Sequence, residues 1–203
     1  MIAVVDYGVG NLFSLRSSLK AVGGSPVVTG DPQTILKADK LILPGVGAFG
    51  DAAEKLRAAG LADVICEAAQ KGTPLLGICL GMQLLFERSY EYGMHSGLGL
   101  IPGTVNPICT QIPKELKIPH MGWNALHFPE HKSRIFEGVS QGEYVYFVHS
   151  YAAQTDKAYV SATTDYGACL TAAAERDNIF GCQFHPEKSG PAGLRILENF
   201  CRL

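Results

Sequence analysis

The stretch Gly77-Ile78-Cys79-Leu80-Gly81 decides how this chain folds and where its chemistry lies. It follows the apolar run 74–76 and opens a segment of helical character that extends to Phe86. A cysteine between two glycines at a strand-to-helix turn matches the nucleophile-elbow pattern, with cysteine in place of serine. The turn is so sharp that side chains at the two glycine positions would collide with neighbouring backbone. The sulfur then lies at a helix N-terminus, where the dipole favours the thiolate. The pattern therefore favours a nucleophile over a buried structural cysteine.

The length and composition predict a single soluble globular domain spanning 1–203. The net charge is -2 and there is no block of like charges, so a nucleic-acid partner is not expected. No apolar stretch is long enough to cross a membrane, and the N-terminus lacks the basic segment of a signal peptide. The 6 cysteines form no C-x-x-C pair, which predicts free thiols in a reducing cytoplasm and disfavours a zinc site.

The order of apolar segments predicts an α/β fold with a mostly parallel central sheet and helices on both faces. Strands are expected at 2–5, 26–28, 41–43 and in the run into Cys79, with helices at 12–22, 52–59 and 61–70 between them. The second half predicts strands near 104–105, 122–128, 144–148, 158–163, 168–173 and 179–183, and a last helix at 193–203. These later strands follow one another through turns, so part of the sheet is expected to be antiparallel.

A cysteine nucleophile needs a base, and His185 in Gln183-Phe184-His185-Pro186-Glu187 is the strongest candidate. It follows an apolar strand, which Pro186 ends. Residues two apart in an extended chain point the same way, so Glu187 is expected to orient the imidazole of His185 toward Cys79. On its own this segment fits a solvated glutamate beside a strand-ending histidine equally well; together with the elbow it predicts a Cys-His-Glu triad.

Amide chemistry also needs donors for a tetrahedral oxyanion. The elbow supplies the backbone N–H of Leu80. The loop Pro44-Gly45-Val46-Gly47 follows a neighbouring strand, and its glycines permit close approach, so it is expected to supply a second N–H; a plain turn is the alternative. Gln83 lies one helical turn after Cys79, which favours a substrate contact over an ordinary surface position.

Two other patterns are weaker. Gly8-Val9-Gly10 resembles half of a dinucleotide fingerprint, but Phe13 occupies the place of the third glycine, which argues against a nicotinamide site. His120 and His149 lie in aromatic-rich segments, where each fits either a satisfied core histidine or the lining of a cleft or interface.

The elbow, Gln83 and His185-Pro186-Glu187 together resemble the triad-type, class I glutamine amidotransferases. The stretches 6–12, 44–49, 119–124 and 181–190 further resemble the glutaminase subunits of imidazole glycerol phosphate synthases, which act in histidine biosynthesis. The motifs run in the same order from the first strand to the last helix. The resemblance implies a flavodoxin-like glutaminase domain with a partly antiparallel second half.

The same resemblance implies a reaction and a partner. Cys79 would attack the side-chain amide of glutamine and form a thioester, with His185 as general base and acid and Glu187 orienting it. Glutamine would be held by Gly47, Gln83, Ser150 and Tyr151. Ammonia would pass to a (β/α)8-barrel cyclase subunit in a heterodimer. The later chemistry belongs to that partner, so this chain is expected to need no metal or cofactor.

Free glutaminase activity would waste glutamine, so a site that works only with a loaded partner is expected. The Gly45-Val46 peptide is the candidate switch, because a glycine permits the rotation that aims the Val46 N–H at the oxyanion. Candidate interface residues are Trp123, Asn124, Tyr146 and Lys188, for which ordinary packing or a solvated charge is the alternative.

Three other functions fit parts of the pattern. A glutaminase for another acceptor, such as anthranilate or pyridoxal phosphate synthase, would lack the subunit-specific stretches and is distinguished by ammonia transfer to candidate acceptor enzymes. A cysteine peptidase or related hydrolase of similar topology would act on peptides or esters. A non-catalytic binding subunit would be free to lose Cys79, His185 or Glu187, and all three are present.

Overall fold

Seven strands form the central sheet of this chain in the order β11-β12-β13-β4-β3-β1-β2. The structure is a computed structural model that describes residues 1–129 and 132–203. The strands are β1 (Ile2–Val5), β2 (Pro26–Thr29), β3 (Lys40–Leu43), β4 (Leu75–Ile78), β11 (Val160–Asp165), β12 (Cys169–Arg176) and β13 (Ile179–Cys182). From β2 to β13 the neighbours are parallel, whereas β12 and β11 are antiparallel. The predicted change of direction in the second half is thus confirmed.

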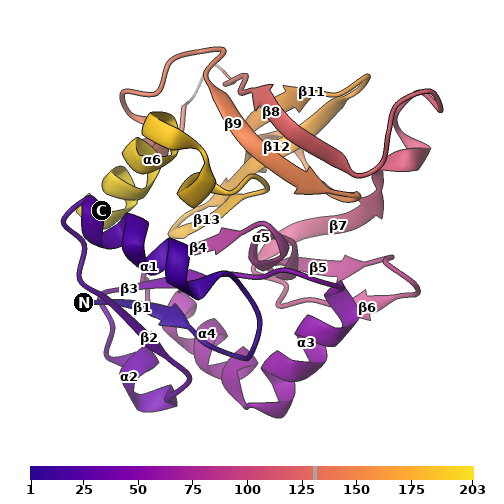
Figure 1. Cartoon of the computed structure of the whole chain (residues 1–203). Coiled ribbons are helices and arrows are strands. Elements are labelled where there is room, and N and C mark those ends of the chain that lie inside the picture. Colours follow the sequence, from indigo (N-terminus) through magenta and orange to yellow (C-terminus); the bar gives the residue numbers. More distant parts are fainter. Residues whose placement is uncertain (130–131) are drawn as a thin grey trace.

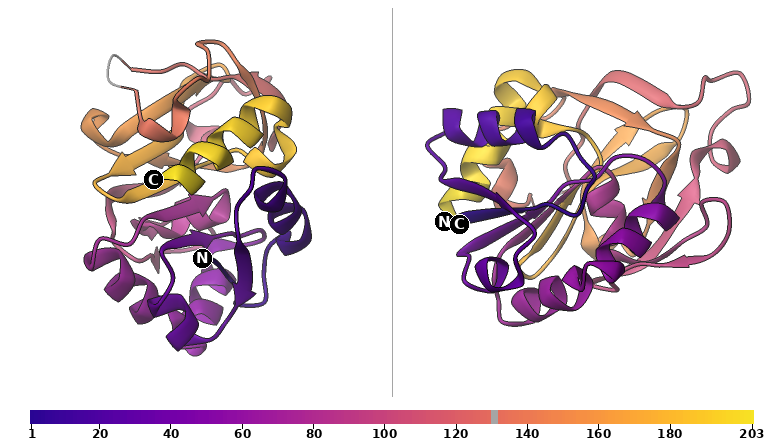
Figure 2. Two further views of the ribbon diagram at one scale, coloured as in Figure 1. Left: turned by 90° about the vertical axis from the view of Figure 1, so that its left-hand side faces the viewer. Right: turned by 60° about the horizontal axis from the view of Figure 1, so that its bottom comes forward.

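The short strands are buried on both faces, as their continuous apolar sequence predicts. On β1, Ala3 and Val5 pack in one core while Ile2 and Val4 pack in the other. The first core is covered by α2 (Pro32–Leu36), α3 (Phe49–Ala58) and α4 (Leu61–Gln70). The second is covered by α1 (Leu12–Ala21) and α6 (Gly190–Arg202), which pack against each other (Figures 1 and 2). Helices therefore cover both faces of the sheet.

Two smaller sheets extend the second half. One has the order β10-β7-β5-β6, and the other pairs β8 with β9. Their strands are β5 (Phe86–Ser89), β6 (His95–Ser96), β7 (Ile101–Pro107), β8 (His120–Ala125), β9 (Tyr144–His149) and β10 (Tyr151–Gln154). Helix α5 (Leu80–Leu84) follows the elbow, and short 3-10 turns occupy Ile108–Thr110, Arg134–Phe136, Lys157–Tyr159 and Pro186–Lys188. None of the helices within 1–129 and 132–203 is both long and apolar enough to cross a membrane.

The predicted helix after the elbow is too long, because α5 ends at Leu84 and a strand begins at Phe86. The fully buried Phe86 pairs with Ile101 in the second sheet, and this tertiary pairing overrides the local helical pattern. The sequence analysis also missed α2, a five-residue helix capped by the Asp31 side chain, which accepts the Thr34 N–H. The other predicted elements of the first half are present, with small shifts at their ends.

The elbow forms where three parallel strands end side by side. β4 lies between β3 and β13, with Ile78 opposite Cys182 and Gly77 opposite Leu43. A Cβ on Gly77 would lie 2.6 Å from the Gly81 carbonyl oxygen, and a Cβ on Gly81 would overlap the Leu43 carbonyl oxygen. The predicted need for two glycines is thus confirmed. The carboxyl ends of the three strands therefore gather Cys79, the 44–47 loop and the segment after β13 at one edge.

The substitution Gly81→Ala tests this steric constraint. Its methyl group would collide with backbone, which cannot rotate away, so we expect a loss of about 3 kcal/mol in the free energy of unfolding. Gly72→Ala is the comparison, since no atom of the described residues lies within 4 Å of the added carbon and its φ of +89°, unlike the backbone of Gly81, introduces conformational strain alone. Its positive φ costs about 1 kcal/mol. Equal denaturant midpoints for the two variants would contradict the steric account.

Candidate active site

Cys79 has the strained backbone expected of a nucleophile elbow. Its φ of 54° and ψ of -111° are uncommon for a residue with a side chain. The strain is held by the surrounding sheet, because the Cys79 N–H donates to the Cys182 carbonyl at 2.7 Å. The sulfur is 3.9 Å from the Val148 carbonyl oxygen and 3.8 Å from Gln183 Nε2. The conformation directs the sulfur away from the strand and toward residues of two other segments.

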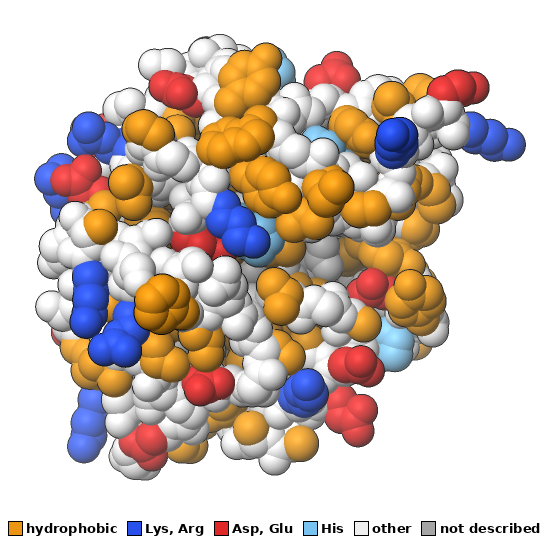
Figure 3. Space-filling view, in the orientation of Figure 1, with side chains coloured by type: hydrophobic (Ala, Val, Ile, Leu, Met, Phe, Trp, Pro, Cys, Tyr) orange, Lys and Arg blue, Asp and Glu red, His pale blue; other side chains and the backbone are white. Residues whose placement is uncertain are grey.

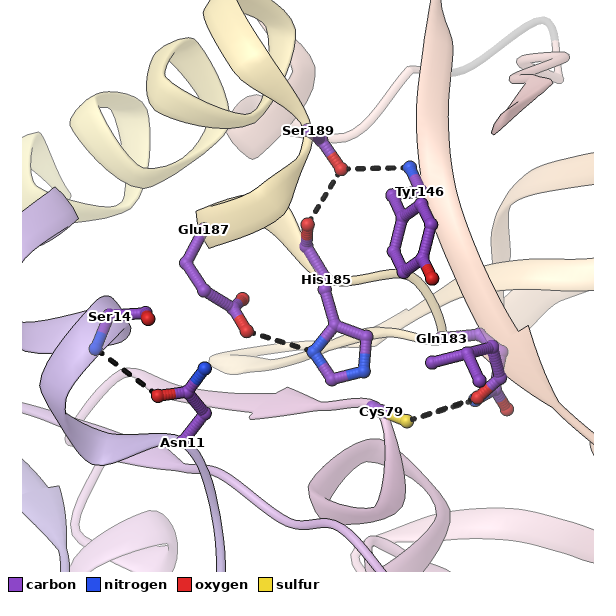
Figure 4. A network of polar contacts seen from close by, with 9 residues as sticks. Asn11, Ser14, Cys79, Tyr146, Gln183, His185, Glu187 and Ser189 are labelled. Atoms are coloured by element: carbon purple, nitrogen blue, oxygen red, sulfur yellow. Dashed lines mark hydrogen bonds and ion pairs between the residues drawn. The ribbon is translucent and has the colours of Figure 1, made fainter. Parts of the chain in front are cut away.

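His185 and Glu187 form the predicted contact, although the chain between them is not extended. His185 Nδ1 and Glu187 Oε1 are 2.9 Å apart, and both side chains are only 4% exposed. Pro186–Lys188 is a 3-10 turn, which brings the carboxylate back to the imidazole; the extended geometry expected from the sequence is wrong. Ser189 Oγ secures this turn by donating to the His185 carbonyl at 2.6 Å. Figure 4 shows the His185 ring between Glu187 and Cys79.

The contacts of His185 favour its protonated form. Burial acts to lower its pKa, but hydrogen bonds to Cys79 and Glu187, together with the charges of these two groups, raise the pKa to about 9. The neighbouring buried thiol of Cys182 differs, because burial and the nearby charge of Glu187 both raise its pKa. The environment therefore singles out Cys79 as the thiol that can give its proton to a histidine.

The loop after β3 lies directly against the elbow. A Cβ on Gly45 would lie 2.9 Å from the Gly81 nitrogen and 3.0 Å from the Leu80 Cβ. Tyr7, which is 6% exposed, holds the loop by donating its hydroxyl to the Pro44 carbonyl at 2.8 Å. Burial raises the pKa of Tyr7, so the hydroxyl stays a donor. Sequence reasoning missed Tyr7, since nothing local relates it to a loop that begins at Pro44.

A cavity of about 300 Å³ opens in front of Cys79. All residues predicted for catalysis, the oxyanion or glutamine binding line it except Glu187, which lies behind His185. Its lining consists of Val46, Gly47, Cys79, Leu80, Gln83, Glu91, Pro119, Val148, His149, Ser150, Tyr151 and His185. Sequence reasoning missed Glu91, Pro119 and Val148. Glu91 adds a carboxylate to the cavity and accepts the Phe49 N–H at 2.6 Å, so it also ties the loop after β5 to helix α3.

His120 and His149 form a buried neutral pair. Both are core histidines with hydrogen-bond partners, and His149 also lines the cavity, so both of the expected alternatives apply. Burial lowers the pKa of each to about 4. His149 Nδ1 is 2.8 Å from the Tyr151 carbonyl oxygen, so this nitrogen carries the proton and Nε2 accepts. His120 Nδ1 lies 2.9 Å from His149 Nε2 and is therefore the donor. Asn124 Nδ2 then donates to His120 Nε2 at 3.3 Å.

The four residues proposed for an interface do not share one environment. Trp123 is 54% exposed and contacts Tyr146 across the β8–β9 pair, with ring centroids 6.2 Å apart. Lys188 Nζ lies 5.8 Å from the Tyr146 ring centroid, so these three side chains are contiguous. Asn124 instead points inward, donating to the Asp165 carbonyl at 2.7 Å as well as to His120.

Comparisons with known proteins agree with this site. The family model for glutamine amidotransferase class-I matches residues 3–203. The imidazole glycerol phosphate synthase subunit HisH of Sulfurimonas denitrificans is 52% identical over 204 residues, covering 100% of this chain and 98% of that protein. The HisH subunit of Aquifex aeolicus is 50% identical over 201 residues, covering 98% and 95%.

Solved structures share the fold. A crystal structure of a glutamine amidotransferase superposes with a TM-score of 0.77 at 18% identity, covering 100% of both chains. The structure of PurLQS from Thermotoga maritima gives a TM-score of 0.73 at 21% identity, covering 99% of this chain and 97% of that one.

A cysteine elbow, a buried His-Glu pair and a full-length family match together define a class I glutamine amidotransferase, and the chain belongs to this family. Within it, the chain groups with the HisH subunits of imidazole glycerol phosphate synthase. Its activity is the hydrolysis of glutamine with transfer of the ammonia. The family, fold class and glutaminase activity expected from the sequence are confirmed.

The raised pKa of His185 predicts a pH dependence of stability. The folded protein binds this proton more tightly than the unfolded chain, whose histidine has a pKa of 6.5. The resulting stabilisation is complete below pH 6.5 and is lost as the pH rises through about 9. We expect the free energy of unfolding to fall over this window by up to about 1.4 kcal/mol per pH unit.

Glu187→Gln is the matched comparison, because it keeps the shape of the side chain and removes the charge beside His185. Its unfolding free energy, measured by denaturant titration from pH 6 to pH 10, should show a smaller slope over the same window. Identical slopes in the two proteins would show that the His185–Glu187 contact does not raise this pKa.

Proposed function

We propose that this chain is the glutaminase subunit of an imidazole glycerol phosphate synthase and supplies ammonia to a (β/α)8-barrel cyclase subunit in histidine biosynthesis. In this assignment residues 1–203 act as one glutaminase domain, in the cytoplasm, where its six free cysteines would stay reduced. The observation that carries the proposal is the convergence of Cys79, His185 and the 44–47 loop on one cavity, with Glu187 bound behind the imidazole.

Catalysis would begin with His185 taking the Cys79 proton. Glu187 holds Nδ1–H, which leaves Nε2 as the base. The sulfur attacks the side-chain carbonyl carbon of glutamine, and the oxyanion is held by the N–H groups of Leu80 and Val46. His185 returns the proton to the amide nitrogen, the C–N bond breaks and ammonia leaves. Water, deprotonated by His185, then cleaves the thioester and releases glutamate. These steps need no metal or cofactor.

Glutamine would be held by Gly47, Gln83, Ser150 and Tyr151. Both N–H groups of the Gln83 amide are already used, by the Tyr151 carbonyl at 3.2 Å and by Gln183 Oε1 at 3.0 Å. Gln83 would therefore contact the substrate through its Oε1, as an acceptor. The carboxylate of Glu91 is the cavity group suited to the α-ammonium of the amino acid.

The oxyanion loop is the proposed point of control. Val46 is 43% exposed, and its backbone N–H makes no hydrogen bond to the residues within 1–129 and 132–203. The Gly45-Val46 peptide can therefore rotate without breaking a bond in the fold, and one missing oxyanion donor costs a factor of about 10²–10³ in rate. A loaded cyclase partner would favour the orientation that aims the Val46 N–H at the substrate.

The partner would bind the outer face of β8 and β9. Alternation along this pair places Trp123 and Tyr146 outward and His120 and His149 inward. Met121 and Tyr144 are also exposed, at 65% and 59%. Figure 3 shows hydrophobic side chains gathered over this region beside a Lys or Arg side chain. An exposed aromatic group next to Lys188 fits a protein partner whose surface carries apolar and acidic side chains.

The direct test measures glutamine hydrolysis in three mixtures: the chain alone, the chain with the cyclase subunit, and both with the ligand of the cyclase. We expect slow turnover alone and an increase of at least 10²-fold in the full mixture, because the second oxyanion donor is then in place. Cys79→Ala should abolish turnover throughout. Activity retained by Cys79→Ala would overturn the assignment, and full activity of the chain alone would overturn the control mechanism only.

The interface is tested by Trp123→Ala, which removes the largest exposed side chain of the β8–β9 face. We expect the dissociation constant of the complex with the cyclase to rise by about 30-fold or more, in line with a buried aromatic anchor. Val27→Ala on the edge strand β2, also exposed at 40%, is the control and should bind normally. Titration calorimetry distinguishes the two, and equal affinities would place the interface elsewhere.

A further inference from the structure

Gln183 is a fully buried amide that touches the nucleophile and has no part in the mechanism above. Its Nε2 lies 3.8 Å from Cys79 Sγ, and its Oε1 accepts the Gln83 N–H at 3.0 Å. It lies two residues before His185, so both side chains approach the sulfur from the segment that follows β13. We propose that Gln183 positions Cys79 and stabilises its thiolate by donating an N–H to the sulfur. This inference rests on the proposed role of Cys79.

The direction of this hydrogen bond is determined by a backbone carbonyl. The Tyr151 oxygen can only accept, so the Gln83 group facing it must be the NH₂. The other proton of that NH₂ faces Gln183, which must therefore present its oxygen there. Consequently the NH₂ of Gln183 faces the sulfur. Turning the Gln183 amide over would place its NH₂ against the NH₂ of Gln83.

The same Tyr151 carbonyl also fixes the tautomer of His149. Its Nδ1–H donates to the Tyr151 oxygen at 2.8 Å, and the ring is neutral because burial lowers its pKa to about 4. The carbonyl thus receives donors from both His149 and Gln83. An unbroken series of hydrogen bonds leads from the β8–β9 pair through Gln83 and Gln183 to the sulfur.

The thiolate form of Cys79 needs a hydrogen-bond donor of this kind. In the thiol form, Cys79 can give its proton to the Val148 carbonyl at 3.9 Å, an acceptor that would repel a thiolate. The Gln183 N–H has the opposite preference, because a hydrogen bond to a charged acceptor is stronger than one to a neutral acceptor. In a site with Cys79 only 7% exposed, little water is present to replace it. Gln183 therefore shifts the sulfur toward its nucleophilic form and away from Val148.

Two substitutions separate this role from support of Gln83. Gln183→Glu has the same shape and keeps an oxygen for Gln83, but it places a second oxygen at the sulfur. Gln183→Met removes both polar groups while filling the space. Gln111→Met is the matched control, since Gln111 has a buried amide nitrogen outside the cavity. Circular dichroism and denaturant titration establish that each variant is folded.

The measurements are the pH dependence of Cys79 alkylation by iodoacetamide, followed by mass spectrometry of the Cys79 peptide, and kcat and KM of the complex with loaded cyclase. We expect both Gln183 variants to shift the midpoint of Cys79 alkylation upward by about one pH unit. kcat should fall about tenfold in both variants, with KM for glutamine within twofold of the wild-type value in Gln183→Glu, which keeps the oxygen for Gln83. The Gln111 variant should match wild type in both.

An unchanged alkylation profile in the Gln183 variants would overturn the inference. So would a raised KM at normal kcat, or normal activity in Gln183→Glu alone, because either result would limit Gln183 to supporting Gln83. Alkylation is measured on the chain without glutamine, so it reports on the sulfur even if the complex proves to have another acceptor. Loss of the proposed function would instead appear as no glutamine hydrolysis by the wild-type complex.

Discussion

The close approach of two backbone segments at Gly81 is the constraint on which the site depends. The Leu43 carbonyl at the end of β3 occupies the space that a side chain at Gly81 would need, and Gly77 is closed off by the turn itself. Because β3, β4 and β13 are parallel neighbours, this contact fixes the elbow relative to the 44–47 loop on one side and to the His185 segment on the other. The positive φ of Cys79 follows from the same turn. Cys79 is thus placed by main-chain packing.

A second property of the site is that its buried polar groups have defined directions. Asn124, His120, His149 and Gln83 each donate a hydrogen bond to the next acceptor, and the Tyr151 carbonyl accepts two of these bonds. Neutral imidazoles can serve in such a series only while their pKa stays low, and the stacking of His120 between Phe147 and Tyr166 keeps water away from it. Hydrogen bonds of this kind make the site rigid, and one wrong tautomer would leave a buried group unpaired.

Sequence patterns predicted the parts of this protein that depend on local chemistry. The elbow needs two glycines at fixed spacing, and His185-Pro186-Glu187 needs only a short turn, so both could be predicted from adjacent residues. The loop at Gly45 could be predicted because parallel strands end at one edge. Tyr7, Glu91 and Gln183 could not, because each acts on a segment 37 or more residues away, through contacts that exist only after the sheet has formed. The length of helix α5 was overestimated for a related reason, because the pairing of Phe86 with β7 is non-local.

The β8–β9 pair connects the proposed partner-binding surface with the surroundings of Cys79. Along each strand, successive residues alternate between the outer face, with Trp123 and Tyr146, and the inner face, with His120 and His149. A partner that shifts Trp123 and Tyr146 would also act on His120 and His149, because the same two strands carry both pairs. His149 is one residue from Val148, whose carbonyl faces the sulfur, and from Ser150 in the cavity lining. Binding on the outer face can therefore alter the surroundings of Cys79 through displacements within a single strand, with no large rearrangement of the fold.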